Sequence, residues 1–251
     1  MNKTRRNFSK KYLQGRGVEF GALHGPLFTC KQSQVIYVDR FTKKELLNKF
    51  PELIRYSESI VSTDIILDID GGDFSQITKQ NFNFFIANHV IKHLINPIRF
   101  LKKIHEAMSS GSILYLAVPD KNYTFDKNRE LTTIDHLWRE YIEDINELSN
   151  KHLKDFILNI TKDHIEPERK AKMYFKNDKL PFSYFEKRRI YKLHKERSIH
   201  VHVWNQLTFD QFLHFTIDQL KLMFKIVDSC SSNDSESHEM IYIIKKSEEH
   251  K

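Results

Sequence analysis

Glycine is scarce in this sequence and unevenly placed. The 251 residues contain seven glycines, all within the first 111 residues. Glycine is used where the backbone needs a positive φ or close approach to another group, so backbone-level recognition is expected in the N-terminal half. Gly21 and Gly25 flank a tight turn after the short apolar run 18–20, which is typical of a buried strand.

The sequence also lacks the features of membrane, secreted and metal-binding proteins. No run approaches the roughly 18 apolar residues of a transmembrane helix, and the basic N-terminus has no apolar signal region. Cys30 and Cys230 lie far apart, without metal-ligand spacing, which favours a reduced environment. His89 and His93 are four residues apart but lack the glutamate of a zinc-protease motif. We therefore expect a cytoplasmic protein with no membrane insertion and no metal.

Length and composition are those of one globular domain. Hydrophobic residues make up 40% and aromatic residues 12% of the chain, enough for a substantial core. The formal net charge of +7 would suit an anionic partner. No long block of like charge occurs, so lysines on solvated helix faces are the stronger explanation of this charge.

Short apolar runs alternate with helical stretches up to about residue 120. Five of these runs are expected to be strands: 17–20, 34–40, 63–70, 82–90 and 112–120. They are continuously apolar, as in a parallel sheet that is covered on both faces. Two late runs, 224–230 and 239–246, are expected to be strands as well. The prediction is an α/β fold with a doubly wound, mostly parallel, seven-stranded sheet.

Helical patterns connect and follow these strands. The clearest helix has Asn96 as N-cap, Pro97 in its first turn and Gly111 just past its end. Residues 121–200 are charged, aromatic and mostly helical in pattern. We therefore expect residues 1–251 to form a single domain in which 121–200 is a helical insertion after strand five that covers an acceptor site.

The N-terminal half follows the logic of nucleotide-binding α/β folds. A glycine turn follows the first strand, and Asp39 ends the second strand 18 residues after Gly21, close to the usual spacing for a ribose-binding carboxylate. The dinucleotide fingerprint is absent, and residues 28–34 leave little room for a crossover helix, which argues against NAD. Glu19, just before the turn, would suit a cationic ligand such as S-adenosylmethionine.

Five segments together resemble one family. They are VEFGALHGPL, VIYVDR, DIILDID, ANHVIKHLINPIRFLKKIHEAMSSGSILYLAVPDKNYTFD and HVHVW. They are similar to class I S-adenosylmethionine-dependent methyltransferases, most of all to the bacterial subgroup associated with surface-polysaccharide and glycan biosynthesis. The resemblance is strong over residues 17 to about 136. It implies a Rossmann-like methyltransferase fold with S-adenosylmethionine as cofactor.

The resemblance also implies cofactor-binding positions. They are Glu19, Gly21, Ala22, Gly25, Asp39, Arg40, Asp68, Ile69, Asn88 and His89. Asp39 would bind the ribose and Asp68 the adenine amino group. Asn88 and His89 would lie over the methionine portion. Each carboxylate has a simpler alternative role. Asp39 could cap the following helix, and Asp68 could stabilise a turn without binding the cofactor. Lys92, where relatives often carry glutamate, is expected to face solvent.

Acceptor and catalytic residues are expected among the histidines and in the loop after strand five. A hydroxyl acceptor benefits from a general base, and histidine is the usual choice near neutral pH. We expect His136 or His202 to be that base, oriented by Asp120 or Asp126. Four residues are expected to bind the acceptor: Tyr123, Arg129, His200 and His93. The alternatives are a loop held by its own hydrogen bonds and, for 200–204, a surface strand with solvated histidines.

The function expected from these features is O-methylation of a small polar, anionic acceptor in surface-glycan biosynthesis. The acceptor would be a sugar or a phosphorylated or nucleotide-linked intermediate, and the protein a monomer or homodimer. Nucleic acid is an unlikely partner, because no RNA-binding module is recognisable. An RNA methyltransferase and a non-catalytic protein that kept the fold remain alternatives.

Overall fold

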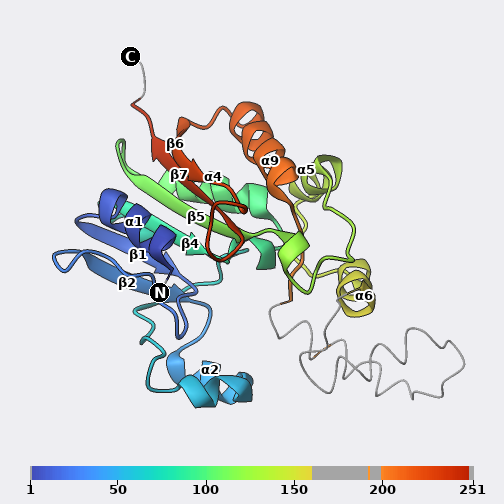
Figure 1. Cartoon of the computed structure of the whole chain (residues 1–251), viewed down its shortest axis with the longest axis horizontal. Helices are drawn as coiled ribbons and strands as arrows, with labels where there is room; N and C mark the ends of the chain where they lie inside the picture. Colours follow the sequence, from blue (N-terminus) through green and yellow to red (C-terminus); the bar gives the residue numbers. More distant parts are fainter. Residues whose placement is uncertain (1, 160–191, 193–198, 249–251) are drawn as a thin grey trace, which may run out of the picture.

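The computed structural model describes residues 2–159, 192 and 199–248 and is built around one seven-stranded sheet (Figure 1). The strand order is β3-β2-β1-β4-β5-β7-β6. Strands β1 to β5 pair in parallel, and β7 runs antiparallel to β5 and β6. The predicted doubly wound, mostly parallel sheet is confirmed. The strands are β1 (Arg16–Phe20), β2 (Gln34–Asp39), β3 (Ile65–Ile66), β4 (Phe84–Asn88), β5 (Ile113–Pro119), β6 (Phe224–Cys230) and β7 (Glu239–Lys246).

Helices of different lengths connect and cover these strands. None of those described combines the length and apolar character that a membrane crossing requires. The α-helices are α1 (Lys3–Tyr12), α2 (Lys43–Lys49), α3 (Ser75–Thr78), α4 (Pro97–Ala107), α5 (Ile134–Ile142), α6 (Asn150–Asn159) and α9 (Gln206–Gln219). Single 3₁₀ segments are η1 (Pro51–Tyr56), η2 (Ile91–His93) and η3 (Lys121–Tyr123).

Both faces of the sheet are buried, which explains the continuously apolar strands. Successive side chains of a strand point to opposite faces, and in β4 Phe85 joins the core beneath α4 and α9, whereas Phe84 joins Leu13 on the face covered by α1. The connection from β1 to β2 contains no helix, as the short spacing predicted. Helix α1, which precedes β1, covers that face instead (Figure 1).

Helix α4 forms as the sequence indicates. Asn96 is its N-cap and accepts a hydrogen bond from the Arg99 amide at 2.9 Å, and Pro97 occupies the first turn, where no amide donor is needed. The predicted apolar stripe, which includes Leu101 and Ile104, is buried against the sheet.

Two expected strands differ from the structure. The run 63–70 pairs only at Ile65–Ile66, because the chain turns directly afterwards, where the Asp68 carboxylate accepts from the Asp70 amide. The segment 200–204 is not a strand; the amides of Val201 and His202 both donate to the Lys92 carbonyl rather than to a sheet neighbour. The expected lid role of 121–200 stays a prediction, since most of 160–198 lies outside the described residues.

Candidate active site

A pocket of about 390 Å³ opens at the carboxyl ends of β1, β2 and β4, beside the turn that follows β3. This is the switch point of the sheet, where the strand order reverses between β1 and β4 and where ligands bind in doubly wound folds. The lining includes seven of the predicted cofactor residues and one predicted acceptor residue: Gly21, Asp39, Arg40, Asp68, Ile69, Asn88, His89 and His93.

The glycine turn after β1 contributes backbone to this pocket. Gly21 has φ +60°, a conformation that favours glycine, and its amide donates to the Val38 carbonyl at 2.9 Å. Glu19, Ala22 and Gly25 do not belong to the lining.

The Glu19 carboxyl group does not line the pocket and instead forms hydrogen bonds with the loop after β1. It accepts from the Leu27 amide at 2.9 and 3.1 Å and thereby closes the loop after β1. Burial raises the pKa of Glu19 to about 8, so the group is largely uncharged at neutral pH. This environment disfavours the ionised form of Glu19, which would be needed to attract a cationic ligand.

Three aspartates occupy different positions around the pocket. The Asp39 carboxylate lies in the lining and also accepts from the Phe41 amide at 3.2 Å, and burial raises its pKa. Asp68 is exposed and holds the turn after β3. Asp70 accepts from the amides of Ile95 and Asn96, which fixes the start of α4 against the pocket.

The end of β4 carries the polar groups nearest the switch point. The Oδ1 atom of Asn88 is buried, and no described residue donates to it. His89 adopts φ +60°, an uncommon conformation for a residue with a Cβ, of the kind that collects at functional sites. Its side chain is 36% exposed and lies in the lining.

His89 is held by a carboxylate from the other end of the chain. Glu239, the first residue of β7, is fully buried and lies 2.7 Å from the Nε2 atom of His89. Arg5 of α1 donates to both oxygens of Glu239, and its guanidinium lies 3.1 Å from the same histidine nitrogen. Burial acts to raise the pKa of Glu239, but the hydrogen bonds from Arg5 and His89 lower it to about 2.

Sequence reasoning missed Arg5 and Glu239, and no local signal could have found them. They lie 234 residues apart, one in a basic helix and the other at the start of an apolar strand. They become functional candidates only when β7 inserts beside β5 and α1 packs on the sheet so that Arg5 reaches Glu239.

Lys92 does not face solvent, and that expectation is wrong. Its side chain is buried in η2, and its ammonium has no hydrogen bond or ion pair within the described part of the chain. Burial lowers its pKa to about 8, while Asp126 and Glu239 oppose this shift electrostatically. Burial is the main cause that lowers the pKa of His89, and the positive charge of Lys92 lowers it further.

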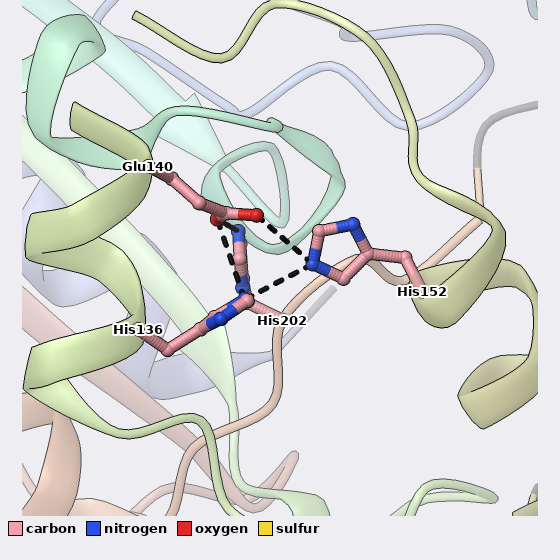
Figure 2. Close-up of side chains that lie close together, drawn as sticks. All are labelled: His136, Glu140, His152 and His202. Carbon is pink, nitrogen blue, oxygen red and sulfur yellow. Dashed lines mark hydrogen bonds and ion pairs between the residues drawn. The ribbon is translucent and has the colours of Figure 1, made fainter. Parts of the chain in front are cut away.

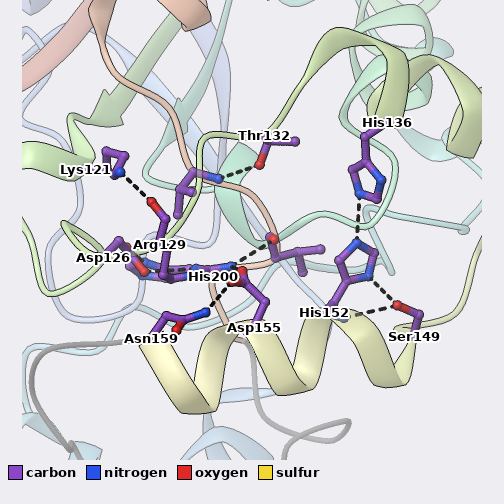
Figure 3. A network of polar contacts seen from close by, with 12 residues as sticks. Lys121, Asp126, Arg129, Thr132, His136, Ser149, His152, Asp155, Asn159 and His200 are labelled. Atoms are coloured by element: carbon purple, nitrogen blue, oxygen red, sulfur yellow. Dashed lines mark hydrogen bonds and ion pairs between the residues drawn. The ribbon is translucent and has the colours of Figure 1, made fainter.

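The predicted acceptor residues after β5 form a separate network (Figure 3). Arg129 is fully buried and donates to Asp126 at 2.9 Å, to Asp155 of α6 and to the His200 carbonyl. His200 pairs with the other oxygen of Asp126 at 2.5 Å. These bonds fasten the loop after β5 to α6 and to segment 199–204, and none of the residues lines the pocket.

The remaining predicted residues also lie outside the pocket lining. Asp120 accepts from the Asn122 amide and the Ser232 hydroxyl, and Tyr123 stacks on His238 while 50% exposed. His136 and His202 approach each other in a cluster of their own. His202 and His200 are buried, so the alternative of solvated histidines on a surface strand is wrong.

The comparison with family models decides the assignment. Residues 2–159, more than half of the chain, match the family model described as a methyltransferase domain. The chain belongs to this family. It is therefore a methyltransferase, and the sequence resemblance implies S-adenosylmethionine as its cofactor. No protein of curated function matches it in sequence.

Solved methyltransferases have similar folds at low identity. The CurJ carbon methyltransferase is 14% identical with a TM-score of 0.43, over 96% of this chain and 50% of that one, so the present chain spans half its length. An S-adenosylmethionine-dependent methyltransferase from Clostridium acetobutylicum is 10% identical (TM-score 0.48; 98% and 89% covered). The plantazolicin methyltransferase BpumL, solved with S-adenosylhomocysteine, is 12% identical (TM-score 0.45; 98% and 84% covered).

The pocket of this methyltransferase fits S-adenosylmethionine chemically. A carboxylate, Asp39, lies at the end of β2, where ribose hydroxyls could donate to it. The buried oxygen of Asn88, to which no described residue donates, provides an acceptor for an ammonium or amide donor. Apolar side chains such as Leu46 and Leu53 line the same space and could pack against a planar base.

Proposed function

We propose that this methyltransferase methylates a hydroxyl group of a small polar acceptor, a sugar or a phosphorylated or nucleotide-linked intermediate of surface-glycan assembly. The observation that carries the proposal is the His89–Glu239 pair at the edge of the pocket. A hydroxyl is a weak nucleophile and gains from a base that removes its proton. S-adenosylmethionine, when bound, supplies an electrophilic methyl group on a sulfonium.

His89 has the protonation state that a base requires. Glu239 is ionised and can only accept, which favours the imidazole proton on Nε2, 2.7 Å away. In this tautomer the Arg5 guanidinium, 3.1 Å from the same nitrogen, donates to Glu239 and not to His89. The lone pair is then on Nδ1, where the hydroxyl proton of the acceptor would go. His136 and His202 are less suited to this role because neither lines the pocket.

Cationic groups near His89 favour an acceptor with negative charge. The Lys92 ammonium interacts electrostatically with His89 and has no hydrogen-bond partner within the described residues. Lys92 does not line the pocket, so its charge would attract a phosphate or carboxylate of the acceptor electrostatically rather than by direct contact. Arg5 adds a second cation, although Glu239 already neutralises it.

The cofactor roles of the lining residues are part of the same proposal. Asp39 accepts the ribose hydroxyls, Asp68 and Ile69 meet the adenine, and Asn88 binds near the methionine portion. Their support is that all four line one pocket at the switch point.

Replacing Asp39 with asparagine should weaken S-adenosylhomocysteine binding about 10- to 100-fold. Hydrogen bonds to a charged group contribute about 1.5–3 kcal/mol, and asparagine keeps the acceptor that the Phe41 amide needs. Isothermal titration calorimetry measures the change. Asp218→Asn, on the exposed side of α9, is the matched control and should bind like the wild type. An unchanged affinity in Asp39→Asn would remove Asp39 from the site.

The acceptor is tested with methyl-labelled S-adenosylmethionine and a panel of sugars, sugar phosphates and nucleotide sugars, with product mass spectrometry. We expect transfer to a hydroxyl oxygen. Transfer only to RNA, with the steep salt dependence of phosphate contacts, would support the RNA alternative. Cofactor binding without transfer to any acceptor would support a non-catalytic role.

The Lys92→Met variant tests whether the charge of Lys92 helps to bind a charged acceptor. Methionine fills a similar volume without charge, so KM for a phosphorylated acceptor should rise about 10-fold or more, while KM for its dephosphorylated form stays within about twofold. Steady-state kinetics with both acceptors checks this. Equal effects on the two would contradict an anion-binding role for Lys92.

A further inference from the structure

Four side chains from three separate segments converge at one point (Figure 2). His136 and Glu140 lie one turn apart on α5, His152 is on α6, and His202 belongs to the extended segment 199–204. One nitrogen or oxygen of each lies within 4.8 Å of the others. Glu140, His152 and His202 are buried, and His136 is half-buried.

The distances in this cluster match the edges of a metal coordination shell. His136 Nε2 lies 3.0 Å from His152 Nε2 and 3.4 Å from a Glu140 oxygen, and His152 Nε2 lies 3.2 Å from the other Glu140 oxygen. In a tetrahedral zinc site with bonds of about 2.0–2.1 Å, neighbouring ligand atoms are about 3.3–3.4 Å apart. The three distances are close to such edges, although two of them end on different oxygens of Glu140. His202 is the fourth group, with its Nε2 atom 3.6 Å from Glu140 Oε2.

Hydrogen bonding alone does not satisfy this cluster. Among the described residues, six buried side-chain atoms have no hydrogen-bond partner, and two of them are Glu140 Oε2 and His202 Nδ1. His202 Nε2 donates to the Ile95 carbonyl and also lies 3.6 Å from Glu140 Oε2, so the lone pair is on Nδ1, to which no described residue donates. A buried lone pair without a partner is costly, and a divalent cation would accept it.

Outer hydrogen bonds orient two of the rings as metal ligands are usually oriented. Metal-binding histidines donate their second nitrogen to a carbonyl, carboxylate or similar group. His202 does so through Ile95. His152 contacts the Ser149 hydroxyl through Nδ1 at 3.0 Å, which leaves Nε2 toward the cluster (Figure 3).

We propose that His136, Glu140, His152 and His202 form a structural zinc site. Three imidazoles and one carboxylate suit zinc among the divalent metals. All four positions are filled by protein, which is the pattern of a structural rather than a catalytic site.

The zinc site would tie the pocket wall to the segments behind it. The amides of Val201 and His202 both donate to the Lys92 carbonyl, and His93, the next residue, lines the pocket. Fixing His202 therefore fixes η2 (Ile91–His93), while His152 holds α6 in place. This inference does not depend on the identity of the acceptor.

The proposal differs from the expectation of no metal, which rested on the spacing of neighbouring residues. His136 and Glu140 have helix spacing, but His152 and His202 follow at 16 and 66 residues from His136. Only the fold brings the four together.

The test uses the full-length chain, expressed without a histidine tag and analysed by inductively coupled plasma mass spectrometry. We expect about one zinc per chain. Glu140→Gln and His152→Ala should each lose most of it, and His214→Asn, an exposed histidine on α9, should retain it. Wild-type protein without bound zinc, and without a rise in unfolding temperature when zinc is added, would overturn the proposal. So would stoichiometric zinc in both ligand variants.

A second measurement uses only the wild-type protein and therefore does not depend on whether the variants fold. Chelation of the wild-type protein should lower its unfolding temperature by about 5 °C or more, since a ligand bound only to the native state stabilises it. Re-addition of zinc, but not of magnesium, should restore it. Cobalt added to the chelated protein should give the intense visible absorption of a tetrahedral site. An octahedral cobalt spectrum, or an equal response to magnesium, would contradict a tetrahedral zinc site.

Discussion

Replacing His89 with asparagine should lower kcat for hydroxyl methylation about 10²- to 10⁴-fold, the usual contribution of a general base. Asparagine tolerates the left-handed backbone that His89 adopts at φ +60°, so the turn after β4 should persist. S-adenosylhomocysteine affinity, measured by calorimetry, should change only a few-fold. His214→Asn, remote from the pocket, is the control for general effects of losing a histidine.

The pH profile distinguishes a base from a merely structural histidine. Burial lowers the pKa of His89 below its ordinary value of 6.5, so the neutral, active form persists to a lower pH than for a free histidine. Wild-type kcat should fall only below pH 6.5, the ordinary pKa of histidine, and the variant should lack this acidic limb. Imidazole should partly restore activity to His89→Gly. A loss below about fivefold, or an unchanged acidic limb in the asparagine variant, would contradict the assignment.

The sheet could be predicted from sequence because its signals are local. The apolar runs that become β1, β4 and β5 are buried on both faces, and Asn96 with Pro97 marks the start of α4. Asp39 could be placed at the pocket because a strand end and a glycine turn fix its position in this fold. The predicted strand 63–70 is longer than the observed β3, because its apolar residues are followed at once by a turn that contains Asp68 and Asp70.

The candidate base and the metal cluster could not be predicted, because they depend on contacts across the whole chain. His89 was assigned to the cofactor, and only its partner Glu239, 150 residues later, makes it a candidate base. His136 and His202 looked like bases because they follow strand five and lie in a polar segment. The structure turns them toward each other and toward Glu140, away from the pocket.

Glu239→Gln should destabilise the protein by about 3–5 kcal/mol at pH 7, because it removes one partner of a buried ion pair and leaves the Arg5 charge uncompensated. For a chain of this length we expect an unfolding temperature about 6–20 °C lower. Differential scanning calorimetry measures it, with Glu58→Gln on the surface as the matched control. The double variant Arg5→Met/Glu239→Gln should lose less stability than the two single losses added together.

The same residue predicts how stability depends on pH. The folded pKa of Glu239 is about 2, below the value near 4.5 expected for the unfolded chain. A depressed carboxyl pKa stabilises the fold fully above about pH 5, and this contribution is lost as pH falls toward 2. It amounts to about 3 kcal/mol, which urea unfolding between pH 7 and pH 3 should detect as a steeper decline in the wild type than in Glu239→Gln. Parallel declines, or a variant as stable as the wild type at pH 7, would show that Arg5 and His89 do not hold Glu239 ionised.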